Sequence, residues 1–127
     1  MATTAAAIGT IRLIPAPGRP TRGMNIRVQE VRHGARPVPG NGTTWVVSRV
    51  NSKSFYVRSG GQEDRHPVAT WSAWFQDRFT EGVVFLDGDP VRPPEGTPRR
   101  FGAETDPRHR DLRILRAARE VLGAYKI

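Results

Sequence analysis

The stretch that decides the fold is TTWVVSRVNSKSFYVR, residues 43–58. Segments 43–50 and 53–58 are rich in β-branched and aromatic residues, which favours strands. Because only Asn51-Ser52 separates them, the pattern predicts a β-hairpin. Side chains alternate along a strand, so four apolar residues are expected on one face of the hairpin. They are Trp45, Val47, Phe55 and Val57. Tyr56 then lies on the opposite face.

Weaker β signals flank this hairpin. Residues 8–14 are predicted as a short strand that ends in a proline-rich stretch, and the run from Met24 alternates like a half-buried strand. Segment 34–42 is rich in proline and glycine and is predicted to be a loop. Gly60-Gly61 is expected to break the sheet.

A helix is predicted over about 67–81. Pro67 suits a first helical turn, because the amide hydrogen that proline lacks has no partner there, and Gly82 is a natural stop. An apolar stripe follows helical spacing. Its members are Val68, Trp71, Phe75 and Phe79. Val83–Leu86 is then expected to be a closing strand, and Asp87-Gly88-Asp89-Pro90 a turn.

The predicted domain organisation has four parts: a flexible lead at 1–7, a β-rich core domain at 8–89, a Pro/Gly-rich arm at 90–105 and a C-terminal amphipathic helix at 106–125 that packs on the core. Asp106-Pro107 supplies an N-cap residue followed by proline at the first helical position.

The fold class is therefore predicted to be α+β, with a small bent antiparallel sheet or an SH3-like partly open barrel. The central hairpin, followed by a loop and a short helix, resembles the pattern of small SH3-like barrels over part of the chain. That resemblance implies binding of a nucleic acid or a peptide and no particular reaction.

Charge is the strongest compositional signal. The chain has 20 Lys and Arg against 12 Asp and Glu, giving a formal net charge of +8, and every basic residue except Lys53 and Lys126 is arginine. The planar guanidinium group suits phosphate because it donates two parallel hydrogen bonds. The charge predicts a nucleic-acid partner, DNA or RNA. The alternative explanation for the high arginine content is a GC-rich genome, whose codons favour arginine.

Three groups of residues are candidates for nucleic-acid binding: the arm, one face of the C-terminal helix, and the hairpin with its outward aromatic ring. They are Arg99 and Arg100; Arg108, Arg110, Arg113, Arg116 and Arg119; and Arg49, Tyr56 and Arg58. A small accessory or regulatory protein, of the kind found in phages and mobile elements, would use such a surface.

The alternative function is a protein-binding module, such as a viral structural component or an inhibitor of a host protein, whose basic surface meets an acidic partner. Trp74 lies off the helical stripe and Phe101 follows the basic pair of the arm, so both are candidate interface residues. Segments 15–23 and 90–106 would order around that partner.

An enzyme is not expected, and no cofactor or metal is predicted. The chain has no cysteine, which excludes disulfides and thiol nucleophiles, and its three histidines lack metal-ligand spacing. Asp87 and Asp89 could hold a divalent cation in a small hydrolase, although a turn explains them better. Without a long apolar run or a basic, apolar leader, the chain is expected in the cytoplasm.

Overall fold

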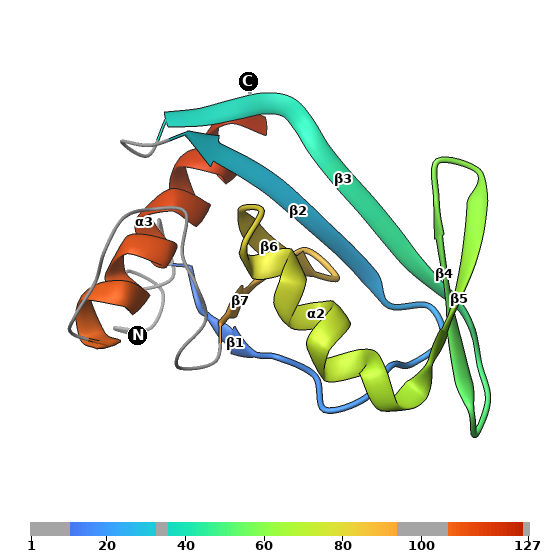
Figure 1. Ribbon diagram of the computed structural model, residues 1–127. Helices are drawn as coiled ribbons and strands as arrows, with labels where there is room; N and C mark the ends of the chain where they lie inside the picture. Colours follow the sequence, from blue (N-terminus) through green and yellow to red (C-terminus); the bar gives the residue numbers. More distant parts are fainter. Residues whose placement is uncertain (1–10, 33–35, 94–106, 126–127) are drawn as a thin grey trace, which may run out of the picture.

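The computed structural model describes residues 11–32, 36–93 and 107–125. In chain order its elements are β1 (Ile14–Pro15), β2 (Asn25–Arg32), β3 (Arg36–Val50), β4 (Ser54–Ser59), β5 (Gln62–Pro67), the 3-10 helix η1 (Val68–Thr70), α2 (Trp71–Phe79), β6 (Val83–Leu86), β7 (Asp89–Arg92) and α3 (Pro107–Tyr125). The described chain is a small α+β structure built on one sheet (Figure 1).

The strands lie in the order β1-β7-β6-β2-β3-β4-β5, and every neighbouring pair is antiparallel except the parallel pair β1 and β7. The sheet is strongly bent, and β4 and β5 lie at a large angle to β6 and β7 (Figure 1). Its ends, β1 and β5, do not meet. The predicted α+β class is confirmed, whereas the SH3-like barrel is not.

The predicted central hairpin is formed by β3 and β4. Val47 pairs with Val57 and Val50 pairs with Phe55, and the register shifts by a bulge between Val47 and Arg49. The bulge turns two successive side chains of β3 toward the same face. Ser48 and Arg49 are those two residues.

The expectation that Gly60-Gly61 breaks the sheet is wrong. Both glycines have positive φ, 59° and 83°, as a two-residue hairpin turn requires. They connect β4 to β5, where Ser59 pairs with Gln62. Strand β5 reads QEDRHP and shows no apolar alternation, because an edge strand is stabilised by backbone pairing and its charges protect the open edge.

Two segments predicted outside the sheet belong to strands: one extends β3 and the other forms β7. From Arg36 the segment expected as a loop belongs to β3, where Pro37 pairs with Val31 and Gly42 with Gln29. This half of β3 is paired with β2 alone, and a strand paired on one side tolerates proline. Strand β7 occupies the start of the expected arm, after a two-residue Asp87-Gly88 turn with φ of 50° and 93°. Residues 94–105 lie outside the described residues.

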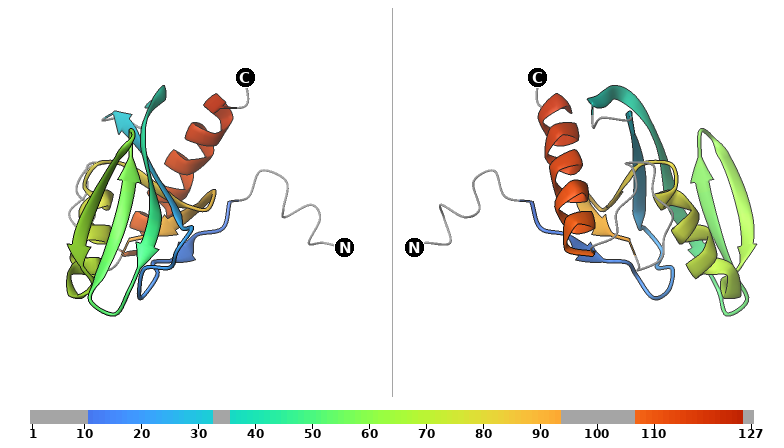
Figure 2. Two further views of the ribbon diagram at one scale, coloured as in Figure 1. Left: turned by 90° about the vertical axis from the view of Figure 1, so that its right-hand side faces the viewer. Right: turned by 60° about the vertical axis from the view of Figure 1, so that its left-hand side comes forward.

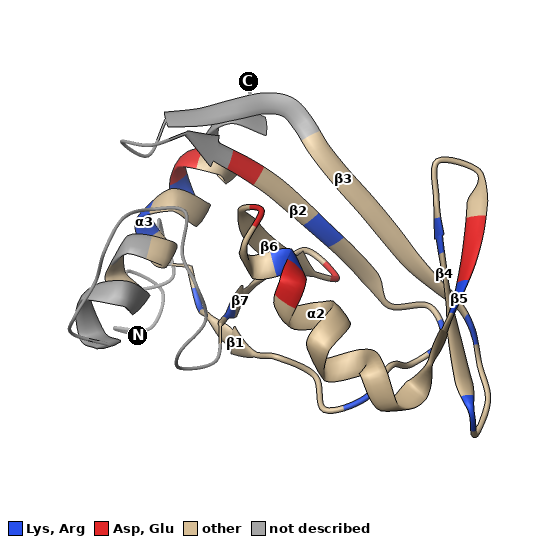
Figure 3. Ribbon diagram, viewed as in Figure 1, with Lys and Arg blue, Asp and Glu red and all other residues tan. Residues whose placement is uncertain are grey.

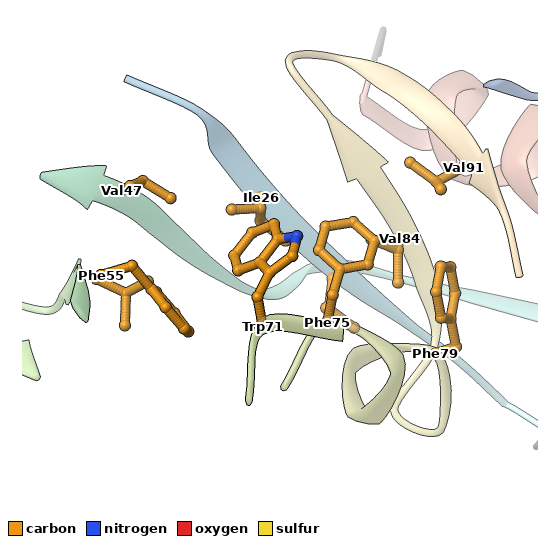
Figure 4. Close-up of a cluster of buried hydrophobic side chains, with 10 residues drawn as sticks. Ile26, Val47, Phe55, Trp71, Phe75, Phe79, Val84 and Val91 are labelled. Atoms are coloured by element: carbon orange, nitrogen blue, oxygen red, sulfur yellow. The ribbon is translucent and has the colours of Figure 1, made fainter. Parts of the chain in front are cut away.

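Helix α2 covers one face of the sheet, called here the inner face. Its rings point from the helix into the sheet, as Figure 4 shows for Trp71, Phe75 and Phe79. The buried residues of this cluster are Ile26, Val28, Val47, Phe55, Val57, Trp71, Phe75, Phe79, Val84 and Val91. The predicted stripe is thus confirmed, but the helix starts later than predicted, since Pro67 ends β5 and Val68 begins η1.

Helix α3 covers the opposite, outer face at β6 (Figure 2). Val83 and Phe85 alternate with Val84 along β6, so they face α3 while Val84 faces α2. The second cluster of buried residues consists of Val83, Phe85, Ile114, Ala117, Ala118 and Val121. Ile11 and Leu13, which belong to the segment predicted as a strand at residues 8–14, both pack against this cluster, although β1 is only Ile14–Pro15.

Gly82 has a different role from the predicted helix stop. Helix α2 ends at Phe79 with Thr80 as its C-cap, and Gly82 does not have positive φ. It lies instead against β2, where an added Cβ would overlap the backbone carbonyl of Gln29. The absence of a side chain therefore lets β6 approach β2.

We expect Gly82→Ala to lower the free energy of unfolding by about 1–3 kcal/mol, because backbone atoms must move to admit the methyl group. Chemical denaturation measures the change. Gly18→Ala is the matched control, because a Cβ there meets nothing within 4 Å and φ is not positive. Equal stability of the two variants would contradict the close approach.

Candidate functional site

The outer face of the sheet is covered by α3 at one end and uncovered at the other. Cross-strand partners lie on the same face, so the face of Phe85 continues through Arg27 to Thr44. Two residues further along β3, Val46 pairs with Arg58 on β4. Thr44, Val46 and Arg58 are all exposed. Helix α3 also contacts β3. We therefore restrict the name open face to the exposed outer surface of β4, β5 and the part of β3 from Thr44 onward.

Arg49 and Tyr56 form a stacked pair on the open face. They are cross-strand partners, and the guanidinium carbon of Arg49 lies 4.1 Å from the centroid of the Tyr56 ring. The same guanidinium donates a hydrogen bond of 3.1 Å to Glu63 on β5. Its plane is therefore fixed by one ring and one carboxylate.

Glu63 is the carboxylate that connects the three strands. Arg49 donates a hydrogen bond to one carboxylate oxygen of Glu63, and the other oxygen lies 3.6 Å from a guanidinium nitrogen of Arg58. The latter oxygen also accepts a hydrogen bond from the Ser48 hydroxyl. The Ser48 hydrogen bond is the main cause that lowers the pKa of the Glu63 carboxyl below its ordinary value. Desolvation opposes it, and the nearby Arg49 and Arg58 guanidinium groups lower the pKa further. The carboxylate form of Glu63 is therefore favoured down to a lower pH than in an ordinary glutamate.

The arginines of this cluster remain accessible. The side chains of Arg49 and Arg58 are 63% and 57% exposed, whereas that of Glu63 is 24% exposed. Arg65, the cross-strand partner of Tyr56 on β5, is also exposed. Figure 3 shows the basic positions of β4 and β5 beside an acidic segment of β5. Three exposed guanidinium groups thus share the open face with one carboxylate.

The predicted nucleic-acid residues fall into three sets. Arg49, Tyr56 and Arg58 are brought together on the open face. Arg116 and Arg119 are exposed on α3, opposite its buried side. The remaining predicted positions lie outside the described side chains. They are Arg99, Arg100, Arg108, Arg110 and Arg113.

Trp74, a predicted interface residue, is half-buried at the edge of the inner core. Its ring lies 5.6 Å from that of Trp45 and 5.7 Å from that of Trp71. The Arg78 guanidinium lies 4.7 Å from the Trp74 ring and pairs with Glu81 at 3.4 Å. Phe101, the other predicted interface residue, lies outside the described residues.

Of the acidic pair considered for a metal site, Asp87 lies in the two-residue β6–β7 turn and Asp89 begins β7. The Asp87 side chain accepts a hydrogen bond of 3.0 Å from the Asn25 backbone, and the Asp87 amide donates to the Asn25 carbonyl at 2.8 Å. Asp89 pairs with Leu86 in the ladder. No group of three or more potential metal ligands occurs among the described residues.

Sequence reasoning missed Ser48, Glu63 and Arg65. Two of them lie on β5, which was not recognised as a strand. The Gly60-Gly61 pair could have predicted β5, because a two-glycine turn after a clear strand favours a hairpin. That hairpin places Glu63 opposite Arg58.

Comparison with known proteins adds no relative: no family model, no curated protein and no solved structure matches the chain. Among the described helices, none has the length and apolar character needed to cross a membrane. The function must therefore be argued from the chain's own residues.

The lowered pKa of Glu63 gives a direct test of this cluster. Ser48→Ala is expected to raise that pKa toward the ordinary value of 4.5, since it removes the main hydrogen bond to the carboxylate. A carboxyl ¹³C titration by NMR measures it, with Ser52→Ala in the exposed turn as the control. An unchanged pKa in Ser48→Ala would show that the hydroxyl does not hold the carboxylate.

The same shift makes the stability of the cluster depend on pH. A carboxyl whose pKa is lowered by folding stabilises the fold fully above its unfolded value, here 4.5, and loses this contribution as the pH falls through the folded value. Glu63→Gln should therefore be less stable than wild type at pH 7, and the difference should shrink by pH 3. Denaturation midpoints at the two pH values measure this.

Proposed function

We propose that the protein binds nucleic acid through the open face of its sheet. The observation that carries the proposal is the grouping of Arg49, Arg58 and Arg65 around the Tyr56 ring, with Glu63 as the one acidic side chain described among them. Guanidinium groups bind phosphate oxygens in pairs of hydrogen bonds, and an aromatic ring offers a stacking surface to a base.

Two features make this surface better suited to phosphate than scattered surface charge. Arg49 is already stacked on Tyr56, so less side-chain freedom is lost when it contacts a ligand. The strands beneath are fixed by the buried inner core, because Val47 and Val57 lie on the opposite face of the same β3–β4 pair. The cations are therefore carried by a rigid platform.

Helix α3 supplies a second basic element. Arg116 and Arg119 are exposed on the side of α3 that faces away from the sheet, and α3 itself lies on the outer side. A polyanion that contacts the open face and continues along α3 would meet cations in both places. Each neutralised phosphate releases counterions, which makes the affinity depend on salt.

Two double variants test the two basic elements. Arg49→Ala/Arg58→Ala and Arg116→Ala/Arg119→Ala should each weaken binding and reduce the slope of log affinity against log salt by about 2, one for each lost phosphate contact. Fluorescence anisotropy with labelled DNA and RNA over a salt series measures this. The control is Arg12→Ala/Arg92→Ala, which removes equal charge at the β1–β7 end of the sheet. If Arg49→Ala/Arg58→Ala behaves like the control, the open face is not the binding surface.

Glu63 provides a test in the opposite direction. It neutralises part of the charge of Arg49 and Arg58, so Glu63→Gln should strengthen binding about two- to fivefold, the size of effect that an exposed ion pair supports. Asp64→Asn is the matched control, because it removes the same charge from the next residue, whose side chain points to the other face of β5.

Equal gains in Glu63→Gln and Asp64→Asn would show that only net charge matters. A loss of affinity in Glu63→Gln would contradict the proposed competition between this carboxylate and phosphate.

A further inference from the structure

A hollow of about 370 Å³ shares Arg49 and Tyr56 with the open face. It is lined by Arg22, Arg49, Val50, Asn51 and Tyr56. The lining thus combines two guanidinium groups, an aromatic ring, a primary amide and one apolar side chain. Its volume is at the lower end of the range of small-ligand sites, about 300–1,000 Å³.

Arg22 is positioned by a tight turn. The Met24 amide donates to the Thr21 carbonyl at 3.1 Å, and Gly23 between them has a φ of 92°, which places Arg22 at the corner. The turn is attached to β3 by two backbone hydrogen bonds with Val47, of 2.8 and 2.9 Å. Arg22 is exposed and has no carboxylate partner within the part of the chain that the structure describes.

Asn51 is oriented by its own hairpin turn. Its side-chain oxygen accepts hydrogen bonds of 2.8 Å from the backbone amides of Lys53 and Ser54. The oxygen is therefore directed toward the turn, and the amide nitrogen is the group left to donate elsewhere. Within the described residues this nitrogen has no acceptor.

We infer that this hollow binds one nucleotide of a single-stranded nucleic acid, an inference that rests on the proposed function. Arg22 and Arg49 bind the phosphate, and the base extends the stack that the Arg49 guanidinium and the Tyr56 ring begin. The Asn51 amide donates to the base edge or the sugar. A base paired within a duplex cannot enter such a site without leaving its stack. The expected ligand is therefore a single strand.

A second hollow continues the path of the strand. It measures about 320 Å³ and shares Val50 and Asn51 with the first, so the two hollows are adjacent at the β3–β4 hairpin. Arg19 and the hydroxyl-bearing Ser52 and Ser72 also line it. This lining suits the next phosphate and sugar. Trp71 lies at its base but is 2% exposed, so no ring is available for stacking there.

The first experiment separates the hollow from general electrostatic attraction. Arg22→Ala and Arg65→Ala each remove one exposed arginine, but only Arg22 lines the hollow. With a labelled ten-nucleotide single strand, as RNA and as DNA, we expect Arg22→Ala to weaken binding about tenfold and Arg65→Ala only about two- to threefold. Equal losses would overturn the site in the hollow and leave the proposed function standing.

The second experiment tests the stacking ring. Tyr56→Thr keeps a strand-forming residue and removes the ring, so it should weaken single-strand binding about tenfold. Tyr56→Phe keeps the ring and should lose far less. Circular dichroism establishes that both variants fold. In addition, 5-iodouridine placed in the oligonucleotide should cross-link to Tyr56, as mapped by mass spectrometry.

Other outcomes decide between ligands. A duplex of the same sequence should bind more weakly than the single strand at the same salt, and equal affinity would overturn the inference. Tighter binding of poly-glutamate than of the oligonucleotide would also overturn it and favour an acidic protein. Failure of wild type to bind any DNA or RNA at low salt would overturn the proposed function itself.

Discussion

The burial of β6 on both of its faces is the constraint on which the rest of the structure depends. Val84 packs beneath α2 on the inner face, while Val83 and Phe85 pack beneath α3 on the outer face. A strand covered on both sides requires two helices, and the described chain supplies them from distant segments. Helix α3 contacts β2, β3, β6 and β7, whereas the outward residues Thr44, Val46 and Arg58 of β3 and β4 remain exposed. The location of the open face thus follows from where α3 packs on the sheet.

The strands of the open face serve the core and the surface at the same time. Along β4, Phe55 and Val57 are buried in the core beneath α2. Tyr56 and Arg58 alternate with them and face outward. The bulge after Val47 adds a second outward residue on β3, which brings Ser48 and Arg49 to the same side. The cluster around Glu63 is therefore carried by strands whose opposite face is buried in the core.

Local pattern predicts the parts of this fold that bury apolar side chains. The hairpin of β3 and β4, the stripe on α2 and the outward direction of Tyr56 all follow from alternation or helical spacing. Strands β5 and β7 do not, because their pairing is stabilised by backbone hydrogen bonds and their side chains lack the expected pattern. The role of Gly82 is also invisible in sequence, since it depends on the approach of Gln29 from another strand.

The candidate site was predictable only in part for the same reason. Arg49, Tyr56 and Arg58 belong to one hairpin, and their grouping follows from its register. Arg22 lines the same hollow as Arg49 because two hydrogen bonds attach its turn to Val47. Glu63 contacts Arg49 from β5, a strand that the sequence pattern does not indicate. These additions change what the surface can do. A hairpin with two arginines attracts any polyanion. In the proposed site, an arginine held against a ring, with a second arginine across a hollow, would distinguish a stacked base with its phosphate from charge alone.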